Sequence, residues 1–249
     1  MRNSVSRIYA LSKRNAKEIV RDPLSLIFMI GLPLFMEILF YFLVHKLTDQ
    51  FQMKYLAPGI VVFSQAFLAL FTGQLIALDR STSLLTRLYV SKATPVEFIL
   101  SYALPILPLT LVQSILFFLV GGIFDAGLFG VKMLLAIPLS LVTSLFFIGM
   151  GILFGSLCSE KSIGGIASIL IACQSVLSGM WFPIEGLGDG MLALMNALPF
   201  RNATLLVQNT VNGIGDAFAD FWRPLLILLG YTLAAFVSAV LVFRRKMKQ

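Results

Sequence analysis

Long apolar runs separated by short polar stretches restrict this chain to a narrow set of folds. A helix that crosses a bilayer needs about 20 mostly apolar residues. Backbone that faces lipid must satisfy its own hydrogen bonds, so such runs form helices. We therefore expect an all-α membrane protein. Its six spans are Leu24–Val44, Tyr55–Leu78, Val96–Val120, Val131–Leu157, Ile163–Trp181 and Pro224–Phe243.

The composition agrees with a multi-pass membrane protein. Hydrophobic residues make up 58% of the chain and charged residues only 12%, whereas a soluble domain carries about 25% charged residues. The charged residues that give the net charge of +7 lie beside the apolar runs. This placement is typical of residues that orient a membrane protein, and it argues against binding to nucleic acid. His45, Cys158 and Cys173 lie apart in the sequence, so we expect neither a metal site nor a disulfide.

The lysines and arginines predict the orientation. With the N-terminus in the cytoplasm, 14 of the 19 basic residues fall in cytoplasmic segments and five fall outside. Basic residues near span ends concentrate on the cytoplasmic side. We therefore expect both termini in the cytoplasm.

Residues 1–22 predict an amphipathic helix that lies in the headgroup layer and contacts membrane lipid. Its apolar face comprises Val5, Ile8, Tyr9, Ser12, Ala16, Ile19 and Val20, and its charged face comprises Arg7, Lys13, Arg14, Lys17 and Glu18. Asp22 followed by Pro23 is typical of a helix start, so the first span begins on a new axis.

The polar stretch between the second and third spans predicts a short cytoplasmic helix. Its apolar face comprises Leu84, Leu85, Leu88 and Tyr89, with Arg87 beside them. Thr94 and Glu97 predict a capping box that begins the third span. Such a helix either lies on the lipid surface or docks into a groove on a cytosolic partner.

Residues 183–223 are predicted to form an extracellular region. They contain two apolar pieces, Met191–Leu198 and Ala203–Val211, that are too short to cross the membrane. Pieces of this length form re-entrant or interfacial helices.

The sequence favours a protein that carries out no chemistry of its own. Residues 155–162 approach a phosphate-binding loop, but Glu160 replaces the required glycine. The acidic residues are scattered, which argues against an enzyme. Glu37 lies well inside a span, where an ionisable group is expensive. Three roles remain open for it: a structural hydrogen bond, a part in the substrate path or coupling, and proton-driven transport.

Four segments together resemble the permease subunit of ABC-2 type exporters, the architecture shared by ABCG half-transporters and bacterial drug-resistance permeases. They are EIVRDPLSLIFMIGLPLF (18–35), YLAPGIVVFSQAF (55–67), LLTRLYVSKATPVEFILSY (84–102) and SGMWFPIEGLGDGMLALMNALPFRNATLLV (178–207). Family members often have an acidic residue followed by glycine just before the short helix. This chain departs from that pattern, because it has Asp79-Arg80 there. It departs again at Ser101-Tyr102, where a glycine is frequent.

The resemblance implies a single transmembrane domain, residues 1–249, in the bacterial plasma membrane. ATP and Mg would bind to a separate cytosolic ABC ATP-binding subunit, and this chain would bind no cofactor. The helix over residues 82–91 would be the coupling helix, with Leu84, Leu85, Arg87, Leu88 and Tyr89 in contact with that subunit. Glu160 and Lys161 would make a second contact. A second permease copy, identical or paralogous, would complete the pathway.

The resemblance also implies outward transport of a lipophilic drug, peptide or lipid, as in multidrug or antibiotic resistance. The substrate pathway would lie between the second and fifth spans. It would be lined by Phe63, Phe67, Phe71, Gln74, Gln174, Ser175, Ser178 and Met180. The alternative for the phenylalanines is packing against lipid or other helices. Two other functions remain open: a non-transporting immunity or sensor subunit, and an integral membrane enzyme.

Overall fold

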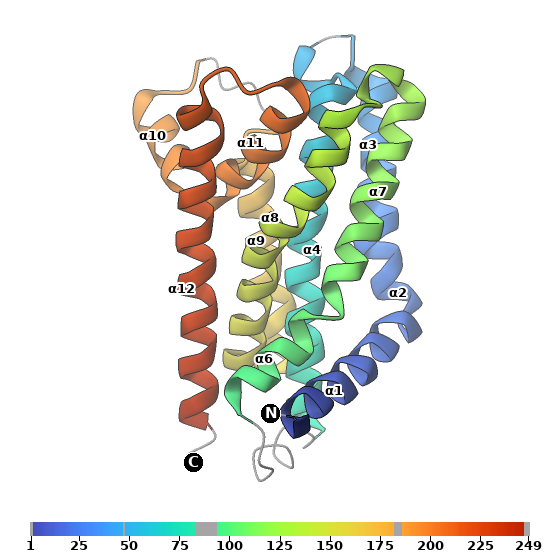
Figure 1. Ribbon diagram of the computed structural model, residues 1–249. Helices are drawn as coiled ribbons and strands as arrows, with labels where there is room; N and C mark the ends of the chain where they lie inside the picture. Colours follow the sequence, from blue (N-terminus) through green and yellow to red (C-terminus); the bar gives the residue numbers. More distant parts are fainter. Residues whose placement is uncertain (1, 47, 83–93, 182–185, 247–249) are drawn as a thin grey trace.

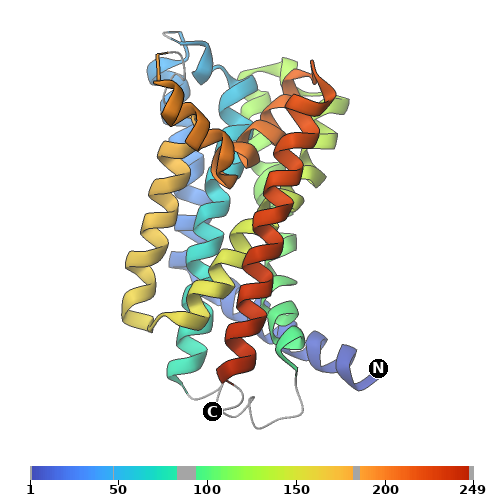
Figure 2. The same ribbon diagram turned by 90° about the vertical axis from the view of Figure 1, so that its left-hand side faces the viewer.

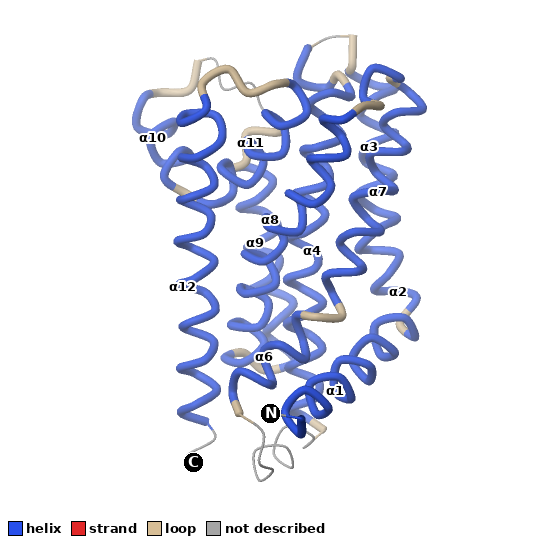
Figure 3. Tube along the Cα trace, viewed as in Figure 1, coloured by secondary structure: helices blue, strands red, loops and turns tan. Residues whose placement is uncertain are grey.

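The computed structural model describes residues 2–46, 48–82, 94–181 and 186–246 of the chain. Within these ranges every regular element is a helix (Figures 1 and 3), and six helices are long and apolar enough to cross a membrane. This confirms the predicted all-α, six-span fold. Both termini lie at one end of the bundle, which we call the terminal end.

The observed spans agree with the predicted ones to within a few residues at most ends. A 20-residue helix, α1 (Arg2–Arg21), precedes them. The spans are α2 (Pro23–Leu26) continued by a π-helical turn (Ile27–Gly31) and α3 (Leu32–Val44); α4 (Met53–Ser81); α6 (Pro95–Ala103) with α7 (Ile106–Phe124); α8 (Val131–Leu157); α9 (Glu160–Leu177); and α12 (Arg223–Lys246) after a π-helical turn (Ala217–Trp222). Short 3₁₀ turns lie at Asp49–Phe51 and Ala126–Leu128.

The third span is broken, whereas the sequence analysis treated it as continuous. α6 ends at Ala103 and α7 begins at Ile106, with Pro105 between them. Proline has no backbone N–H and its ring clashes with the preceding turn, so it interrupts or bends a helix. α6 consequently turns away from the axis of α7 and lies beside α1 at the terminal end (Figure 1). Pro138, by contrast, lies inside an uninterrupted α8.

α4 is the central helix of the bundle. It contacts α3, α7, α8, α9 and α11, and most of its residues are buried. Its closest neighbour is α8, which approaches through two glycines. A Cβ atom at Gly151 would lie 2.5 Å from the Ala69 carbonyl oxygen, and one at Gly155 would lie 2.6 Å from that of Gly73. Small residues at such positions allow two membrane helices to pack backbone to backbone.

Two short helices, α10 (Asp189–Ala197) and α11 (Pro199–Asn212), lie at the end of the bundle opposite the termini (Figure 2). They correspond to the two apolar pieces that the sequence analysis predicted to be helical. α11 packs against α4, α8 and α12. It is also tied to α4 by hydrogen bonds from the Gln208 amide to the Tyr55 carbonyl and from the Asn212 amide to the Lys54 carbonyl, each 2.8 Å long.

The α4–α8 contact gives a test of the fold. We expect Gly155→Ala to destabilise the protein by about 1–3 kcal/mol, the usual effect of overpacking, because the new methyl group meets backbone that cannot move aside alone. Thermal unfolding of the purified protein in detergent measures the change. Gly230→Ala is the matched control, since no atom lies within 4 Å of the added methyl group in α12. Equal melting temperatures for the two variants would contradict the close packing.

Candidate functional site

Five charged side chains and one tyrosine form the contacts that hold the described residues on either side of positions 83–93. We call this set the charged frame, and it comprises Arg7, Arg14, Asp79, Arg80, Glu97 and Tyr102. Positions 83–93 themselves lie outside the described residues, and with them the predicted partner contacts Leu84, Leu85, Arg87, Leu88 and Tyr89.

Asp79 is the buried centre of the charged frame. It lies in the last turn of α4 with only 1% of its surface exposed. Its carboxylate accepts hydrogen bonds from both terminal nitrogens of Arg14 on α1, and from the Tyr102 hydroxyl on α6 at 2.7 Å. Beside this pair the Asn15 amide donates to the Ser101 carbonyl at 3.0 Å. A buried carboxylate needs such partners, so Asp79 joins α1, α4 and α6.

Arg80 points toward a different neighbour. Its guanidinium donates to the Ser156 carbonyl at 2.8 Å and also to the Cys158 carbonyl. Both acceptors lie at the end of α8, where backbone carbonyls have no partner within the helix and attract a cation. The adjacent residues Asp79 and Arg80 therefore fasten the end of α4 to three other helices.

Glu97 fastens the chain on the other side of positions 83–93. The predicted capping box is present: the Glu97 N–H donates to Thr94 Oγ1, and the Thr94 N–H donates to Glu97 Oε2 at 3.1 Å. The same carboxylate accepts from Arg7 Nη2 at 2.8 Å and Arg7 Nε at 3.2 Å. The Ser4 hydroxyl also donates to it. The capping side chain therefore doubles as the attachment point for α1.

α1 connects the two ends of the charged frame. Arg7 and Arg14 are seven residues apart, or about 10 Å along a helix. α1 runs obliquely across the terminal end (Figures 1 and 2). Of the predicted apolar face, Val5 and Tyr9 are each 66% exposed and Val20 is 70% exposed, whereas Ile8, Ser12, Ala16 and Ile19 are half-buried. The sequence analysis did not predict that Arg7 and Arg14, assigned to the outer charged face, bond to buried carboxylates of the bundle.

A single sequence signal pointed to the charged frame. Acidic residues flank the polar stretch on both sides, Asp79 before it and Glu97 after it, although the predicted orientation favours basic residues there. Their partners on α1 are 65 and 90 residues away in the sequence. No local pattern identifies partners at that distance.

The second predicted contact, at Glu160 and Lys161, lies where α9 begins, and both residues are exposed. The turn before it is closed by a capping box between Ser159 and Ser162. Because Arg80 bonds to the Cys158 carbonyl in this turn, the structure brings the turn next to the charged frame.

The eight predicted pathway residues fall into separate environments. Phe71 and Gln74 line an open cavity, described below. Phe63 and Phe67 are buried, and the Phe63 ring packs edge-on against Phe67 and Trp181. This packing is the alternative that the sequence analysis left open for phenylalanines.

The fifth-span members of that set also lie mostly inside the protein. The buried Gln174 amide donates to the Thr204 hydroxyl of α11 at 3.1 Å, and Met180 packs against Gly59. Ser178 is buried and Ser175 half-buried, and the two are linked by a hydrogen bond from the Ser178 hydroxyl to the Ser175 carbonyl.

Glu37 is fully buried among α3, α4 and α7. Its Oε1 lies 3.2 Å from where a Cβ on Gly121 would be, and Ala57 borders the same space. Neither carboxyl oxygen has a hydrogen-bond partner among the described residues. The structural hydrogen bond that the sequence analysis considered for Glu37 therefore has no counterpart in the described part of the chain.

Two comparisons with known proteins bear on this architecture. The sequence model of the family described as ABC-2 type transporter matches residues 6–210. The comparison with curated proteins finds no match.

The Arg14–Asp79 pair predicts a specific pattern of stability. Arg14→Met leaves the buried Asp79 carboxylate without its cation, so we expect a loss of about 3 kcal/mol, the lower end for a broken buried pair because Arg14 is partly exposed. The double variant Arg14→Met/Asp79→Asn removes both charges and should recover part of the loss. Lys17→Met, on the exposed side of α1, is the control. Chemical denaturation in detergent would contradict the pairing if Arg14→Met behaved like Lys17→Met.

Glu37 gives a second prediction. Because its carboxyl oxygens accept no hydrogen bond from the described residues, Glu37→Gln should leave the melting temperature unchanged or raise it. Glu37→Ala should lower it, because truncation opens a cavity in the core. A clear loss of stability in Glu37→Gln would show that the carboxyl group has a partner that the described residues do not supply.

Proposed function

Since the chain belongs to the ABC-2 type transporter family and is a transporter permease subunit, we propose that it is the membrane part of an ATP-driven exporter. A separate cytosolic subunit of the ABC type would bind ATP and Mg and hydrolyse the nucleotide. In this proposal the terminal end of the bundle faces the cytoplasm of a bacterial cell, as the distribution of lysine and arginine predicts.

The charged frame is the observation that supports this proposal best. A permease that does no chemistry must receive movement from its partner through a defined contact. Residues 82–91 are the proposed contact, with Leu84, Leu85, Leu88 and Tyr89 in the groove of the ATP-binding subunit and Arg87 at its rim. The chain is anchored at Asp79 and Arg80 before this segment and at Glu97 after it. A displacement of the segment would therefore act on α1, α4, α6 and α8 together.

The proposed second contact, Glu160 and Lys161, extends the same surface. Arg80 ties the turn before α9 to the end of α4, so both contacts would move with α4. We propose further that two permease copies, identical or paralogous, form the outward pathway for a lipophilic drug, peptide or lipid. Two-fold symmetry is the commonest arrangement among homo-oligomers of soluble proteins, and a pathway between two permease copies would use the same symmetry.

Leu88→Glu tests the proposed coupling contact. A carboxylate on the apolar face of the contact helix would be desolvated in the partner's groove, so we expect the ATP-binding subunit to dissociate and ATP-dependent efflux to be lost. Co-purification of the two subunits and efflux from inside-out vesicles measure the two effects. Lys46→Glu, which adds an acidic residue at the opposite, exposed end, should leave both unchanged.

Two results would overturn the proposal. Transport or nucleotide hydrolysis by the purified chain alone would show that no partner drives it. The complex of unaltered sequence could also retain the ATP-binding subunit and yet export no cargo. That result would instead favour an immunity or sensor subunit.

A further inference from the structure

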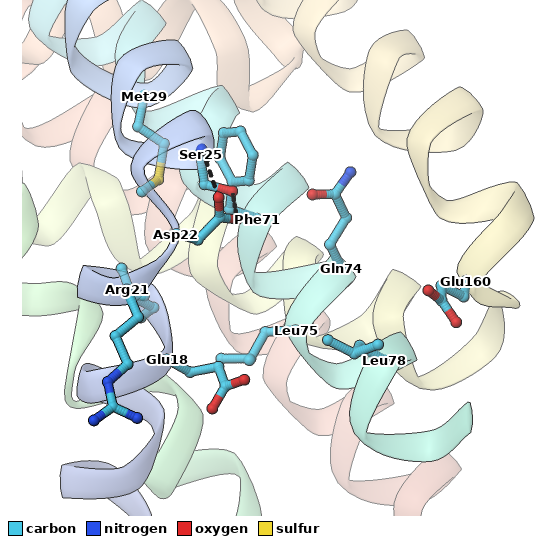
Figure 4. A pocket seen from close by; sticks show the side chains of 11 residues that line it. Glu18, Arg21, Asp22, Ser25, Met29, Phe71, Gln74, Leu75, Leu78 and Glu160 are labelled. Carbon is cyan, nitrogen blue, oxygen red and sulfur yellow. Dashed lines mark hydrogen bonds between the residues drawn. The ribbon is translucent and has the colours of Figure 1, made fainter. Parts of the chain in front are cut away.

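A cavity of about 450 Å³ opens beside α4 near the terminal end (Figure 4). Its walls come from the end of α1, the start of the first span, one face of α4 and the first residue of α9. This volume falls within the range of about 300–1,000 Å³ found for small-molecule sites. The eleven lining residues are Glu18, Ile19, Arg21, Asp22, Ser25, Met29, Phe71, Gln74, Leu75, Leu78 and Glu160.

The cavity is the place where the central helix is uncovered. Between Leu56 and Ala77 every residue of α4 is buried except Leu70, Phe71 and Gln74. Phe71 and Gln74 line the cavity together with Leu75 one turn beyond Phe71, and Met29 and Ile19 face them. The floor is therefore apolar and contains an aromatic ring.

Gln74 differs from the buried polar residues of α4. Gln65 bonds to Ser140 and Thr143, Thr72 bonds to the Leu68 carbonyl and Ser64 to the Val61 carbonyl. The Gln74 amide has no hydrogen-bond partner among the described residues, and its side chain extends into the space between α4 and α9 (Figure 4). A polar group left unpaired on an otherwise apolar wall is typical of a site that orients a ligand.

The rim of the cavity carries an excess of negative charge. It has three carboxylates, on Glu18, Asp22 and Glu160, and one cation, on Arg21. Figure 4 shows the Arg21 guanidinium extending along α1 and away from Gln74 and Glu160. Glu18 also forms a long ion pair with Arg14, whose Nη2 lies 3.8 Å from it, while the same guanidinium is paired more closely with Asp79.

Two of these carboxylates also have local roles. Asp22 caps the first span by accepting hydrogen bonds from the Ser25 hydroxyl and from the Ser25 N–H at 3.1 Å. These bonds hold the pKa of Asp22 below its usual value, so it stays ionised at neutral pH. Glu160 lies in the first turn of α9, where an acid is favoured. Neither role neutralises the negative charge at the rim.

We propose that this cavity binds a lipophilic cation, with its charge between the carboxylates of α1 and α9 and its apolar body on Phe71 and Leu75. Attraction between unlike charges strengthens beside a low-dielectric wall, and the apolar body gains from leaving water for the contact with Phe71 and Leu75. The inference rests on the proposed function, since it names the chemical class of cargo that enters from the cytoplasmic side. The ammonium group of a zwitterionic phospholipid headgroup offers the same cationic contact.

Binding of tetraphenylphosphonium to the purified permease without an ATP-binding subunit tests the proposal. Tetraphenylborate is the matched control, because it has the same size and shape but the opposite charge. We expect saturable binding of the cation and none of the anion in dodecyl maltoside, measured by calorimetry. Glu18→Gln/Glu160→Gln should bind the cation about tenfold more weakly, equal to about 1.4 kcal/mol. Phe71→Leu should weaken binding by a smaller factor.

Asp189→Asn, an acid at the opposite end of the bundle, should bind the cation as the unaltered protein does. Competition by added phosphatidylethanolamine but not by phosphatidylglycerol would identify the lipid headgroup as an occupant, and lack of competition would leave a free lipophilic cation as the occupant. Equal binding of cation and anion would overturn the proposal, as would unchanged affinity in the double variant with an unchanged melting temperature. Because no ATP-binding subunit is present, failure here leaves the coupling proposal intact, and failure of coupling leaves this binding measurable.

Discussion

The arrangement of the helices at the terminal end depends on one buried carboxylate, that of Asp79, and on its need for hydrogen-bond partners. This group lies at the end of the central helix with almost no exposed surface, and a charge in such a place is tolerated only with close partners. Arg14 and Tyr102 supply them from α1 and α6. Because Asp79 needs these partners, α1 and α6 are held against the end of α4. The same contacts position the chain directly before residues 83–93.

The central helix serves three purposes along its length. Toward α8 it packs at backbone contact through Gly151 and Gly155. At its last turn, Asp79 and Arg80 connect it to the terminal-end helices. Along Phe71 and Gln74 it is open to the cavity. α1 provides Arg7 and Arg14 of the charged frame, and it also provides part of the cavity wall. A shift of α1 relative to α4 therefore changes the charged frame and the cavity together.

Local signals predicted local structure well. Apolar length located the six spans, and Thr94 with Glu97 identified a helix start that the structure confirms. The sequence analysis missed the break at Pro105. A proline inside an apolar run does not always interrupt the helix, because α8 continues through Pro138 whereas the third span breaks at Pro105. The predicted pathway residues illustrate the same limit, since Gln174 and Phe67 are buried while Gln74 is open.

The sequence by itself determined that the chain crosses a membrane as a bundle of six spans, because a bilayer leaves apolar helices as the solution for such runs. It also determined most helix ends, which depend on neighbours within a single turn. Only the tertiary structure decided where Arg7 and Arg14 point, which face of α4 stays uncovered, and that Glu18 and Glu160 share a rim. Those outcomes depend on contacts between helices far apart in the chain, and the periodicity of a single helix carries no information about its partner.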